Sequence, residues 1–410
     1  MRLDDVFLID IVKPGKKVVC RIDINSPIGI GGEILDITRF KEHEDTIRYF
    51  INNNNGLVLL AHQGRPGKKD FTSLNKHAEI LREILDYEVK YVPDVVGEQA
   101  INAIKNMHPG DIILLDNVRF VEDEYIVKSI EEHARSKIVR VLHKFFDYFV
   151  LDGFSVAHRQ HASVVGFTTV LPSAVGKLME KEIRNLSWIT AKDVTRAVIL
   201  GGAKTKDAVK YVDLFIKTKK VEKIMLSGLV AFIFHVVSGL KVPIRIREEI
   251  ARDYRSYIPK IKELVKSRVV EFPEDYAIDV NGRKEIHIDE CSKIESMPKD
   301  IGHKTVEKYV DMSKDYDVIV MRGPAGLIEK RGFDIGTKKL LGGLINIGKQ
   351  IMVCGGHLIS VLKDLNIPET KYRKSTAGGA ALEFIANGTL PGIEALKLSK
   401  KLFEEKIGKN

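Results

Sequence analysis

Polar side chains, most of them basic, follow four apolar runs in the first half of the chain. They are Arg21, Asp23 and Asn25 after the first run, His62 and Arg65 after the second, Arg119 after the third, and His158, Arg159 and His161 after the fourth. In an open parallel sheet, a ligand binds beyond the carboxyl ends of the strands. The planar guanidinium group of arginine suits phosphate or carboxylate. A surface salt bridge would explain any single arginine of this set, but the four strand ends together predict an anion-binding crevice.

The histidine pair of the fourth run, His158 and His161, has a spacing that also occurs in metal sites. Two histidines on a loop without a third ligand are a weak signal for a bound metal. We therefore assign no metal ligand from the sequence.

Glycines replace the arginines after the apolar runs of the second half. Residues 197–200 end at Gly201, Gly202 and Lys204, and a helical pattern follows from 205 to 219. Later runs are again followed by glycine, at Gly228, at Gly323 and Gly326, and at Gly355 and Gly356, and two more glycines open a helix at 378–379. Such junctions direct backbone N–H groups and the positive end of a helix dipole toward a phosphate. A tight turn with a solvated Lys204 is the alternative at any one junction, but the repetition favours the polyanionic tail of a nucleotide.

The composition is that of a soluble globular protein with an excess of basic residues. The 410 residues are 44% hydrophobic and 30% charged, and the formal net charge is +9. This charge suits an anionic ligand. Nucleic acid is a weaker alternative, because no block of Lys and Arg is interleaved with aromatic residues. The chain has no G-x-x-x-x-G-K-[ST] sequence, and its Gly-x-Gly at Gly29 and Gly31 lacks a third glycine, which disfavours P-loop and dinucleotide-binding proteins.

Three observations lead us to expect a cytoplasmic protein. The three cysteines include no C-x-x-C pair, which argues against a disulfide framework or a zinc site. The chain starts MRLDD, with two acidic residues and no apolar run, so we expect no signal peptide. The longest apolar run, residues 224–240, is too short and too polar to span a membrane, and we expect a strand followed by a buried helix there.

Apolar runs alternate with helical patterns along the whole chain, which predicts β–α–β units and parallel sheets. In the first half we expect strands at 16–24, 56–61, 89–92, 111–115 and 148–151 and helices at 40–53, 73–85, 96–106 and 129–143. In the second half we expect strands at 197–200, 224–226, 318–321 and 351–353 and helices at 205–219, 248–266, 380–386 and after residue 391. Residues 171–184 continue from a proline into a helical pattern, so we expect a connecting helix there. The length exceeds the roughly 250–300 residues at which single cores stop growing, so it predicts two domains or more.

These motifs, in this order, resemble the phosphoglycerate kinase family, in its archaeal form, over nearly the whole chain. The matching stretches of the first half are RIDINSP at 21–27, HQGRP at 62–66, LDNVRF at 115–120 and AHRQH at 157–161. Those of the second half are GGAK at 201–204, GPAG at 323–326 with Glu329, GTK at 336–338, GG at 355–356 and TAGGA at 376–380. The scarcity of glutamine beside many Lys and Glu is also found in heat-adapted proteins.

The resemblance implies two Rossmann-like α/β domains with parallel sheets, joined by a hinge helix and able to close. Residues 1–170 would bind 3-phosphoglycerate, 171–184 would form the interdomain helix, 185–390 would bind the nucleotide, and 391–410 would return to the first domain. The implied activity is reversible phosphoryl transfer between ATP and the carboxylate of 3-phosphoglycerate, which gives ADP and 1,3-bisphosphoglycerate. The implied cofactor is Mg²⁺. We expect no nucleic-acid or membrane partner, and a monomer or a homodimer.

The resemblance also assigns roles to single residues. The residues implied to bind 3-phosphoglycerate are Asp23, Asn25, Arg39, His62, Arg65, Arg119 and Arg159. Those implied to bind the nucleotide are Gly201, Gly202, Lys204, Gly228, Glu329, Gly355, Gly356, His357 and Leu358. Arg39 and Lys204 are the implied catalytic residues, because they would hold the charge of the transferring phosphoryl group. The acceptor carboxylate is already ionised at neutral pH, so no general base is required.

Three positions depart from the family's pattern. Ala208 stands where many members have a second lysine, His357 where an aspartate tied to the Mg–nucleotide is usual, and Arg322 where asparagine is common. How Mg²⁺ is held is therefore open. The rival hypothesis is a nucleotide-dependent regulator on the same scaffold that has lost its chemistry, which the presence of Arg39 and Lys204 disfavours.

Overall fold

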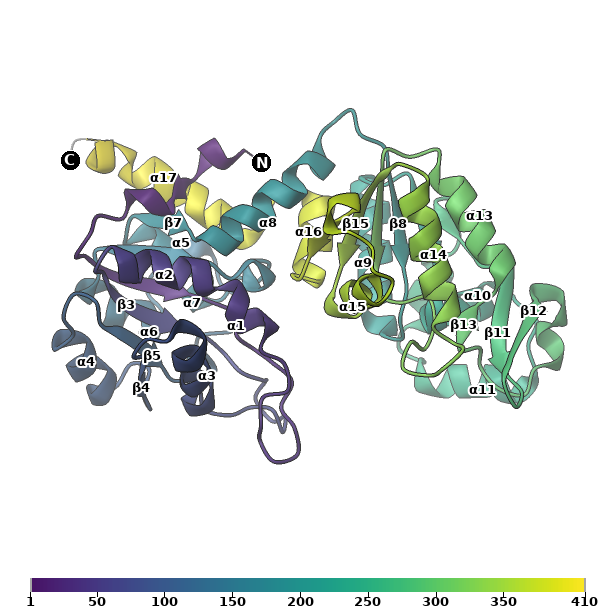
Figure 1. Ribbon diagram of the computed structural model, residues 1–410, viewed down its shortest axis with the longest axis horizontal. Coiled ribbons are helices and arrows are strands. Elements are labelled where there is room, and N and C mark those ends of the chain that lie inside the picture. The colour runs from purple at the N-terminus through teal and green to yellow at the C-terminus, as the bar shows by residue number, and fades with distance from the viewer. Residues whose placement is uncertain (1, 409–410) are drawn as a thin grey trace. The chain divides into compact units, whose positions relative to one another are not determined.

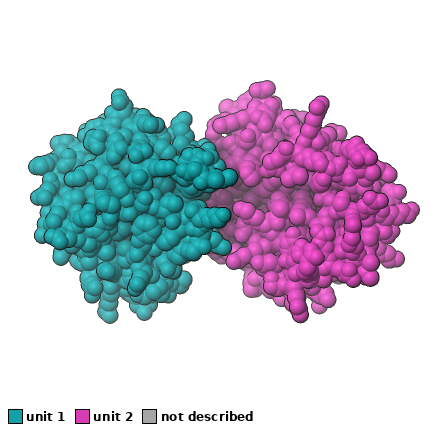
Figure 2. All heavy atoms as spheres, turned by 90° about the horizontal axis from the view of Figure 1, so that it is seen from below, with its two compact units in different colours: residues 1–184, 389–410 teal, residues 185–388 magenta. Residues whose placement is uncertain are grey.

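The computed structural model describes residues 2–408, and the chain divides into two compact units (Figure 2). Unit 1 comprises residues 1–184 and 389–410, and unit 2 comprises residues 185–388. The helix α8 (Lys177–Ser187) begins in unit 1 and ends in unit 2. Within residues 2–408, no helix combines the length and the apolar character needed to cross a membrane.

A parallel sheet of seven strands forms the centre of unit 1 (Figure 1), in the order β1-β7-β6-β2-β3-β5-β4. The strands are β1 (Phe7–Leu8), β2 (Lys17–Arg21), β3 (Gly56–Leu60), β4 (Lys90–Val92), β5 (Ile112–Leu115), β6 (Tyr148–Leu151) and β7 (Ser173–Val175). The register pairs Val18 of β2 with Leu57 of β3 and with Tyr148 of β6. All residues of β3, β5 and β6 are buried, as expected for a parallel sheet that is covered on both faces.

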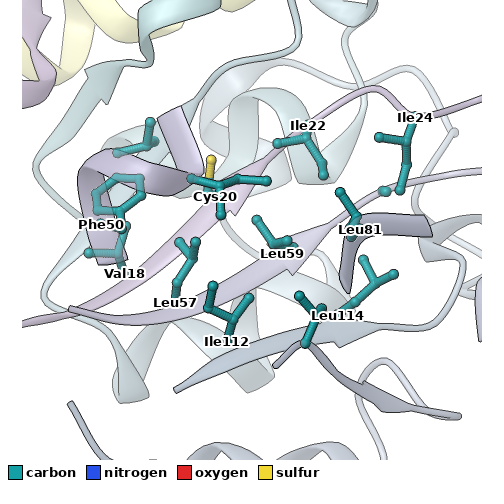
Figure 3. Packing of buried hydrophobic residues seen from close by; sticks show 14 of the residues in the cluster. Val18, Cys20, Ile22, Ile24, Phe50, Leu57, Leu59, Leu81, Ile112 and Leu114 are labelled. Atoms are coloured by element: carbon teal, nitrogen blue, oxygen red, sulfur yellow. The ribbon is translucent and has the colours of Figure 1, made fainter. Parts of the chain in front are cut away.

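The helices of unit 1 are mostly short. They are α1 (Thr38–Glu42), α2 (Glu44–Asn52), α3 (Asn75–Leu85), α4 (Glu98–Lys105), α5 (Ile130–His133), α6 (Lys137–Leu142), α7 (Ala162–Val165) and α17 (Pro391–Gly408), besides the start of α8. Side chains of α2 and α3 pack on one face of the sheet, where Phe50 and Leu81 join Val18, Leu57 and Leu114 in the core (Figure 3). The helix α17 packs against β7, so the end of the chain completes unit 1.

Unit 2 repeats the design with a six-stranded parallel sheet, in the order β10-β9-β8-β14-β15-β16. Its strands are β8 (Arg196–Leu200), β9 (Lys223–Leu226), β10 (Val270–Glu271), β14 (Val318–Arg322), β15 (Gln350–Cys354) and β16 (Arg373–Ser375). Its helices are α9 (Thr205–Thr218), α10 (Gly228–Ser238), α11 (Ile244–Asp253), α12 (Ile258–Leu264), α13 (His303–Ser313), α14 (Ile335–Asn346), α15 (Gly356–Asp364) and α16 (Gly379–Asn387). A small antiparallel sheet of β11 (Asp275–Asp279), β12 (Arg283–His287) and β13 (Asp300–Ile301) lies beside it and was not expected from the sequence.

Four sequence-based predictions of helices are wrong in detail. The helix expected at 40–53 is divided at His43 into α1 and α2. The proposed helix at 171–184 is strand β7 followed by α8, because Pro172 precedes a short run that pairs with β6. The proposed helix at 248–266 is interrupted after α11, and Pro259 lies in the first turn of α12, where its missing N–H is tolerated. The helix expected at 129–143 is divided into α5 and α6.

Candidate active site

The carboxyl ends of β2, β3 and β6 bring the predicted anion-binding residues of unit 1 to one edge of the sheet. The strand β2 lies between β3 and β6, and all three run in the same direction. Asp23 lies two residues beyond β2, and His62 lies two residues beyond β3. Arg119 lies in the turn that follows β5, and Arg159 lies in the loop that follows β6. The four loops therefore start from a common edge, as the sequence predicted.

Asp23 is a buried carboxylate that holds other side chains in place. Its Oδ2 accepts hydrogen bonds from Arg39 and from Ser155, and its Oδ1 accepts one from the Asn25 N–H at 3.2 Å. Burial alone would raise the pKa of Asp23, but Arg39, His62 and Ser155 together hold this pKa well below its usual range. Asp23 is therefore ionised, and it holds the guanidinium group of Arg39 by a charged hydrogen bond.

His62 is buried between two arginines. Arg21 Nη2 donates to His62 Nδ1 at 3.0 Å, and Arg159 Nη1 lies 3.3 Å from His62 Nε2. Both guanidinium groups can only donate, so they compete for the one acceptor nitrogen that a neutral imidazole ring offers. Burial lowers the pKa of His62 well below its usual value, and the three arginines nearby lower it further, although Asp23 opposes them. Cationic side chains thus lie on both sides of His62, which is an arrangement that suits an anion.

The arginines of unit 1 repel one another. Burial lowers the pKa of Arg119 to about 10, and the charges of Arg159, Arg21 and Arg65 lower this pKa in the same direction. Arg119 also donates to the Gly64 carbonyl, so its guanidinium is fixed rather than free to move away from its neighbours. Crowded cations of this kind gain most from a bound dianion.

Asn25 orders the loop that carries Arg65. Its Oδ1 accepts the Gly64 N–H at 2.8 Å. Arg65 itself is exposed, unlike Arg119. The predicted substrate residues therefore include groups that order the loops, such as Asn25 and Asp23, and cations that these loops carry.

Glu124 belongs to this cluster but was missed from the sequence. It is fully buried, and its carboxylate accepts the Ser163 N–H at 2.8 Å and the Ser163 hydroxyl at 2.5 Å. Ser163 Oγ in turn accepts from Arg21 Nε at 2.9 Å. Burial raises the pKa of Glu124 to about 7, against the opposite effects of Arg21 and Ser163. Its neighbours Glu122 and Asp123 are also acidic, so the sequence offers no signal that distinguishes the buried one.

The histidine pair after β6 is not part of the group of side chains with metal-like geometry that is found within residues 2–408. Burial lowers the pKa of His161 to about 3, with Arg159 and other cations adding to the shift. Within residues 2–408, the group of side chains with metal-like geometry lies in unit 2 instead. It consists of Asp275, Glu285 and His303. There Asp275 accepts the first N–H groups of α13 and Glu285 binds Arg283, so ordinary capping and ion pairing explain the cluster.

The glycines after β8 do not have free N–H groups, which corrects the expectation from the sequence. Gly201 N donates to the Arg322 carbonyl at 2.8 Å, and Gly202 N donates to the Pro324 carbonyl at 2.7 Å. A Cβ atom on Gly228 would lie 2.7 Å from Gly202 N, and Gly228 has φ of +64°. These glycines therefore let three strand-end loops of unit 2 cross at close range, and packing is their first role.

The start of α15 is the open glycine junction of unit 2. A Cβ atom on Gly355, Gly356 or Gly378 would meet nothing within 4 Å. The first N–H groups of a helix have no partner inside it, and in α15 they belong to Gly356, His357 and Leu358. Leu358 is buried, so it can offer a ligand only its backbone, whereas the His357 side chain is exposed. This helix end has the space and the polarity to bind a phosphate.

Two charged residues predicted for the nucleotide site are exposed. Lys204 occupies the position just before α9, and Glu329 lies in the loop after β14. Neither is held by burial, so each is available for a ligand.

The departures from the family's pattern have local explanations. Ala208 is buried, so a lysine there would need a different packing. Arg322 Nη2 lies 3.4 Å from Asp207 Oδ2, and its guanidinium lies over the Tyr211 ring, 4.8 Å from the centroid. The charge of Arg322 is therefore partly balanced within unit 2.

The fold and the two strand-end sites define a two-unit α/β protein that is built to bind anionic ligands at the carboxyl edges of parallel sheets. The chain belongs to the phosphoglycerate kinase family, whose model matches residues 8–388. A phosphoglycerate kinase of Saccharolobus solfataricus is 39% identical over 394 residues, with 95% of this chain and 96% of the relative covered. One from Aeropyrum pernix is 38% identical over 402 residues, with 96% of each covered. The crystal structure of phosphoglycerate kinase from Pyrococcus horikoshii OT3 matches with a TM-score of 0.84 and 33% identity, over 97% of this chain and all of that one.

The family catalyses the ATP-dependent phosphorylation of 3-phosphoglycerate in glycolysis, and the protein is an enzyme of this kind. The expected fold class, two parallel-sheet α/β domains, is confirmed. The assignment of single residues to each substrate is a separate question, addressed next.

Proposed function

We propose that the basic crevice of unit 1 binds 3-phosphoglycerate and that the strand ends of unit 2 bind Mg-ATP. The observation that carries this assignment is the cluster of cations in unit 1, in which burial lowers the pKa of Arg119 to about 10 and the charges of Arg159, Arg21 and Arg65 act in the same direction. A small dianion relieves the repulsion among these charges directly. The residues proposed to contact 3-phosphoglycerate are Asn25, Arg39, His62, Arg65, Arg119 and Arg159, with Asp23 orienting Arg39.

The nucleotide phosphates would bind at the start of α15. There the N–H groups of Gly356, His357 and Leu358 and the helix dipole favour negative charge. The glycines at 201, 202 and 228 would keep the neighbouring loops close enough to shape the site. Lys204 and Glu329 would add the charged contacts.

The chemistry is a direct displacement at phosphorus. A carboxylate oxygen of 3-phosphoglycerate attacks the γ-phosphorus of ATP, the bond to the bridging oxygen breaks, and ADP leaves with the electron pair. The attacking group is already ionised, so the protein supplies position and charge rather than a base. Arg39 would orient the carboxylate, and Lys204 would stabilise the charge that develops on the transferred phosphoryl oxygens.

Magnesium would enter with the nucleotide, bound mainly by phosphate oxygens and water. Mg²⁺ prefers oxygen ligands and retains several waters. His357 stands at the position where an acidic residue was expected, and an exposed imidazole is a poor ligand for this ion. We further propose a cytoplasmic enzyme with no nucleic-acid or membrane partner that acts as a monomer or a homodimer.

A coupled assay tests the function directly. ADP formation should require 3-phosphoglycerate, ATP and Mg²⁺ together, and it should stop when any one is omitted. ADP release without 3-phosphoglycerate, or none with all three present, would contradict the proposal.

A further inference from the structure

A buried histidine–carboxylate pair lies directly behind Asp23. His43 separates α1 from α2, and Asp152 follows the last residue of β6. His43 Nδ1 lies 2.6 Å from Asp152 Oδ2, and the two side chains are 1% and 0% exposed. Neither residue can reach a ligand from this position.

Both residues of the pair make further hydrogen bonds. His43 Nε2 accepts the backbone N–H of Asp23 at 2.9 Å, so the ring proton must be on Nδ1, from which it donates to Asp152. The other oxygen of Asp152 accepts the N–H groups of Leu178 and Met179, at 3.0 Å and 3.3 Å, in the first turn of α8. A carboxylate is favoured at a helix N-terminus. The start of α8 therefore anchors Asp152, and Asp152 orients His43.

Gly176 makes this anchor possible. A Cβ atom at position 176 would lie closer than 3 Å to the Asp152 carboxylate. The glycine just before α8 thus leaves the space that Asp152 needs to approach this helix.

A role for His43 as a catalytic base is excluded by its bonding. Its Nε2 lone pair is used by a backbone N–H, and the nearby Ser155 hydroxyl donates to Asp23 rather than to His43. What the pair can do is fix the main chain of residue 23. Arg39, on α1, binds the carboxylate of the same residue. The helix α1 and the residue that ends it therefore hold Asp23 by both its backbone and its side chain.

We propose that His43 is a positioning residue for 3-phosphoglycerate binding, which acts by fixing Asp23 and, through Asp23, the guanidinium of Arg39. The proposal rests on the assignment of 3-phosphoglycerate to unit 1. His43 acts through an acceptor nitrogen of fixed orientation. Its imidazole is buried, and Asp152 holds the ring in one tautomer.

Two amide variants separate the two bonds of His43. In His43→Asn the amide nitrogen can replace Nδ1–H toward Asp152, but the side chain is too short to reach the Asp23 N–H. In His43→Gln the amide oxygen can replace Nε2 toward Asp23. We expect the dissociation constant for 3-phosphoglycerate to rise about tenfold in His43→Asn and by less than about threefold in His43→Gln, as expected for loss or retention of one buried hydrogen bond. The affinity for ATP should stay within about twofold in both.

Controls distinguish positioning from a general loss of structure. Thr46→Ala removes the hydroxyl that accepts the Lys177 N–H at 3.0 Å in the same turn of α8, but Thr46 has no bond to Asp23. It should lower the melting temperature without changing the affinity for 3-phosphoglycerate. Equal weakening in His43→Asn, His43→Gln and Thr46→Ala would overturn the proposal.

Arg119→Ala is the benchmark for the site itself. If it weakens 3-phosphoglycerate binding and His43→Asn does not, the positioning role is wrong and the site assignment holds. If neither variant weakens binding, the assignment of 3-phosphoglycerate to unit 1 has failed. Should His43→Asn not fold, nitrogen NMR of the unaltered enzyme keeps the proposal testable, because it requires the His43 proton on Nδ1. A ring protonated on Nε2 alone would contradict it.

Discussion

The two sheets of this enzyme carry opposite chemistry at the same structural position, the strand ends at which we propose that the ligands bind. In unit 1 the loops beyond the strands carry charged side chains, and in unit 2 the equivalent loops carry glycine. A buried cluster of arginines is costly to assemble without a ligand, since burial and then the charges of Arg159, Arg21 and Arg65 lower the pKa of Arg119. A helix N-terminus has no such self-repulsion, but it needs a backbone that can be approached closely. The parallel sheet thus fixes where a ligand binds, and the loop residues decide how it is bound.

The glycines of unit 2 themselves fall into two groups. Gly201 and Gly228 lie where an added Cβ would clash with neighbouring backbone, whereas Gly355 and Gly356 border open space. The first group is required by packing and the second is free to approach a phosphate. The two groups of glycines cannot be distinguished from the sequence alone.

The largest effect should come from Lys204→Ala. We expect kcat to fall about 10²–10³-fold, by analogy with the loss of one donor to a developing oxyanion, while ATP affinity changes little. Steady-state kinetics beside a direct titration of ATP measures both. Near-normal turnover with a raised KM would make Lys204 a binding residue and move the catalytic charge to Lys206, Lys210 or Arg322.

Removal of a unit 1 arginine should affect one substrate only. Arg119→Ala and Arg65→Ala should each weaken 3-phosphoglycerate binding by about 1.5–3 kcal/mol, the usual value of a hydrogen bond to a charged group. ATP affinity should not change. Calorimetry on each variant checks this, and an equal loss of ATP affinity would mean that the two sites are assigned wrongly.

Alanine at two glycines should separate packing from binding in unit 2. Gly201→Ala should lower the free energy of unfolding by about 1–3 kcal/mol, because its Cβ would lie 2.7 Å from the Gly323 carbonyl oxygen. Gly356→Ala has open space and should leave stability unchanged or slightly raised. Chemical denaturation measures both, and equal destabilisation would remove the distinction drawn between the two groups.

Glu124→Gln should change how stability depends on pH. The pKa of Glu124 is raised from an ordinary 4.5 to about 7 by burial. Between these values the unfolded chain releases the proton while the folded enzyme keeps it, so this residue lowers stability as pH rises and has no further effect above pH 7. The melting temperature of Glu124→Gln relative to the unaltered enzyme should therefore increase from about pH 4.5 to about pH 7 and then level off. Thermal unfolding across this range tests it, and a difference that does not vary with pH would contradict it.

The smallest effect is expected at His357. Since Mg²⁺ prefers oxygen ligands, His357→Ala should change the Mg²⁺ concentration needed for half-maximal activity by less than about twofold. A tenfold rise in this requirement would place His357 next to the metal.

Much of this organisation could be predicted from the sequence. The runs that became β2, β3, β5, β6, β8 and β14 are buried and apolar, and the residues that follow them are the basis of both proposed sites. The missed features depend on distant parts of the chain. The N–H groups of Gly201 and Gly202 donate to the last residue of β14 and to the loop that follows it, about 120 residues away, and no local pattern records that pairing.

One further error arose because a stronger pattern outweighed a local signal. Pro259 marks the start of α12, but the amphipathic pattern around it favoured one long helix. Glu124 lies in an acidic run, so only the fold shows that it is the buried member. The role of His43 is also visible only in the fold, because its partner Asp152 lies 109 positions later.

The separation of two anion sites is tested most directly by placing a negative charge in one site at a time. Arg119→Glu should abolish measurable 3-phosphoglycerate binding and leave Mg-ATP affinity within about threefold, because only unit 1 is changed. Gly356→Asp, at a helix position that accepts aspartate, should do the reverse. Calorimetric titration of both ligands into both variants decides the matter. We predict that Arg119→Glu loses only 3-phosphoglycerate binding and that Gly356→Asp loses only Mg-ATP binding. The loss of both ligands in either folded variant would contradict the account.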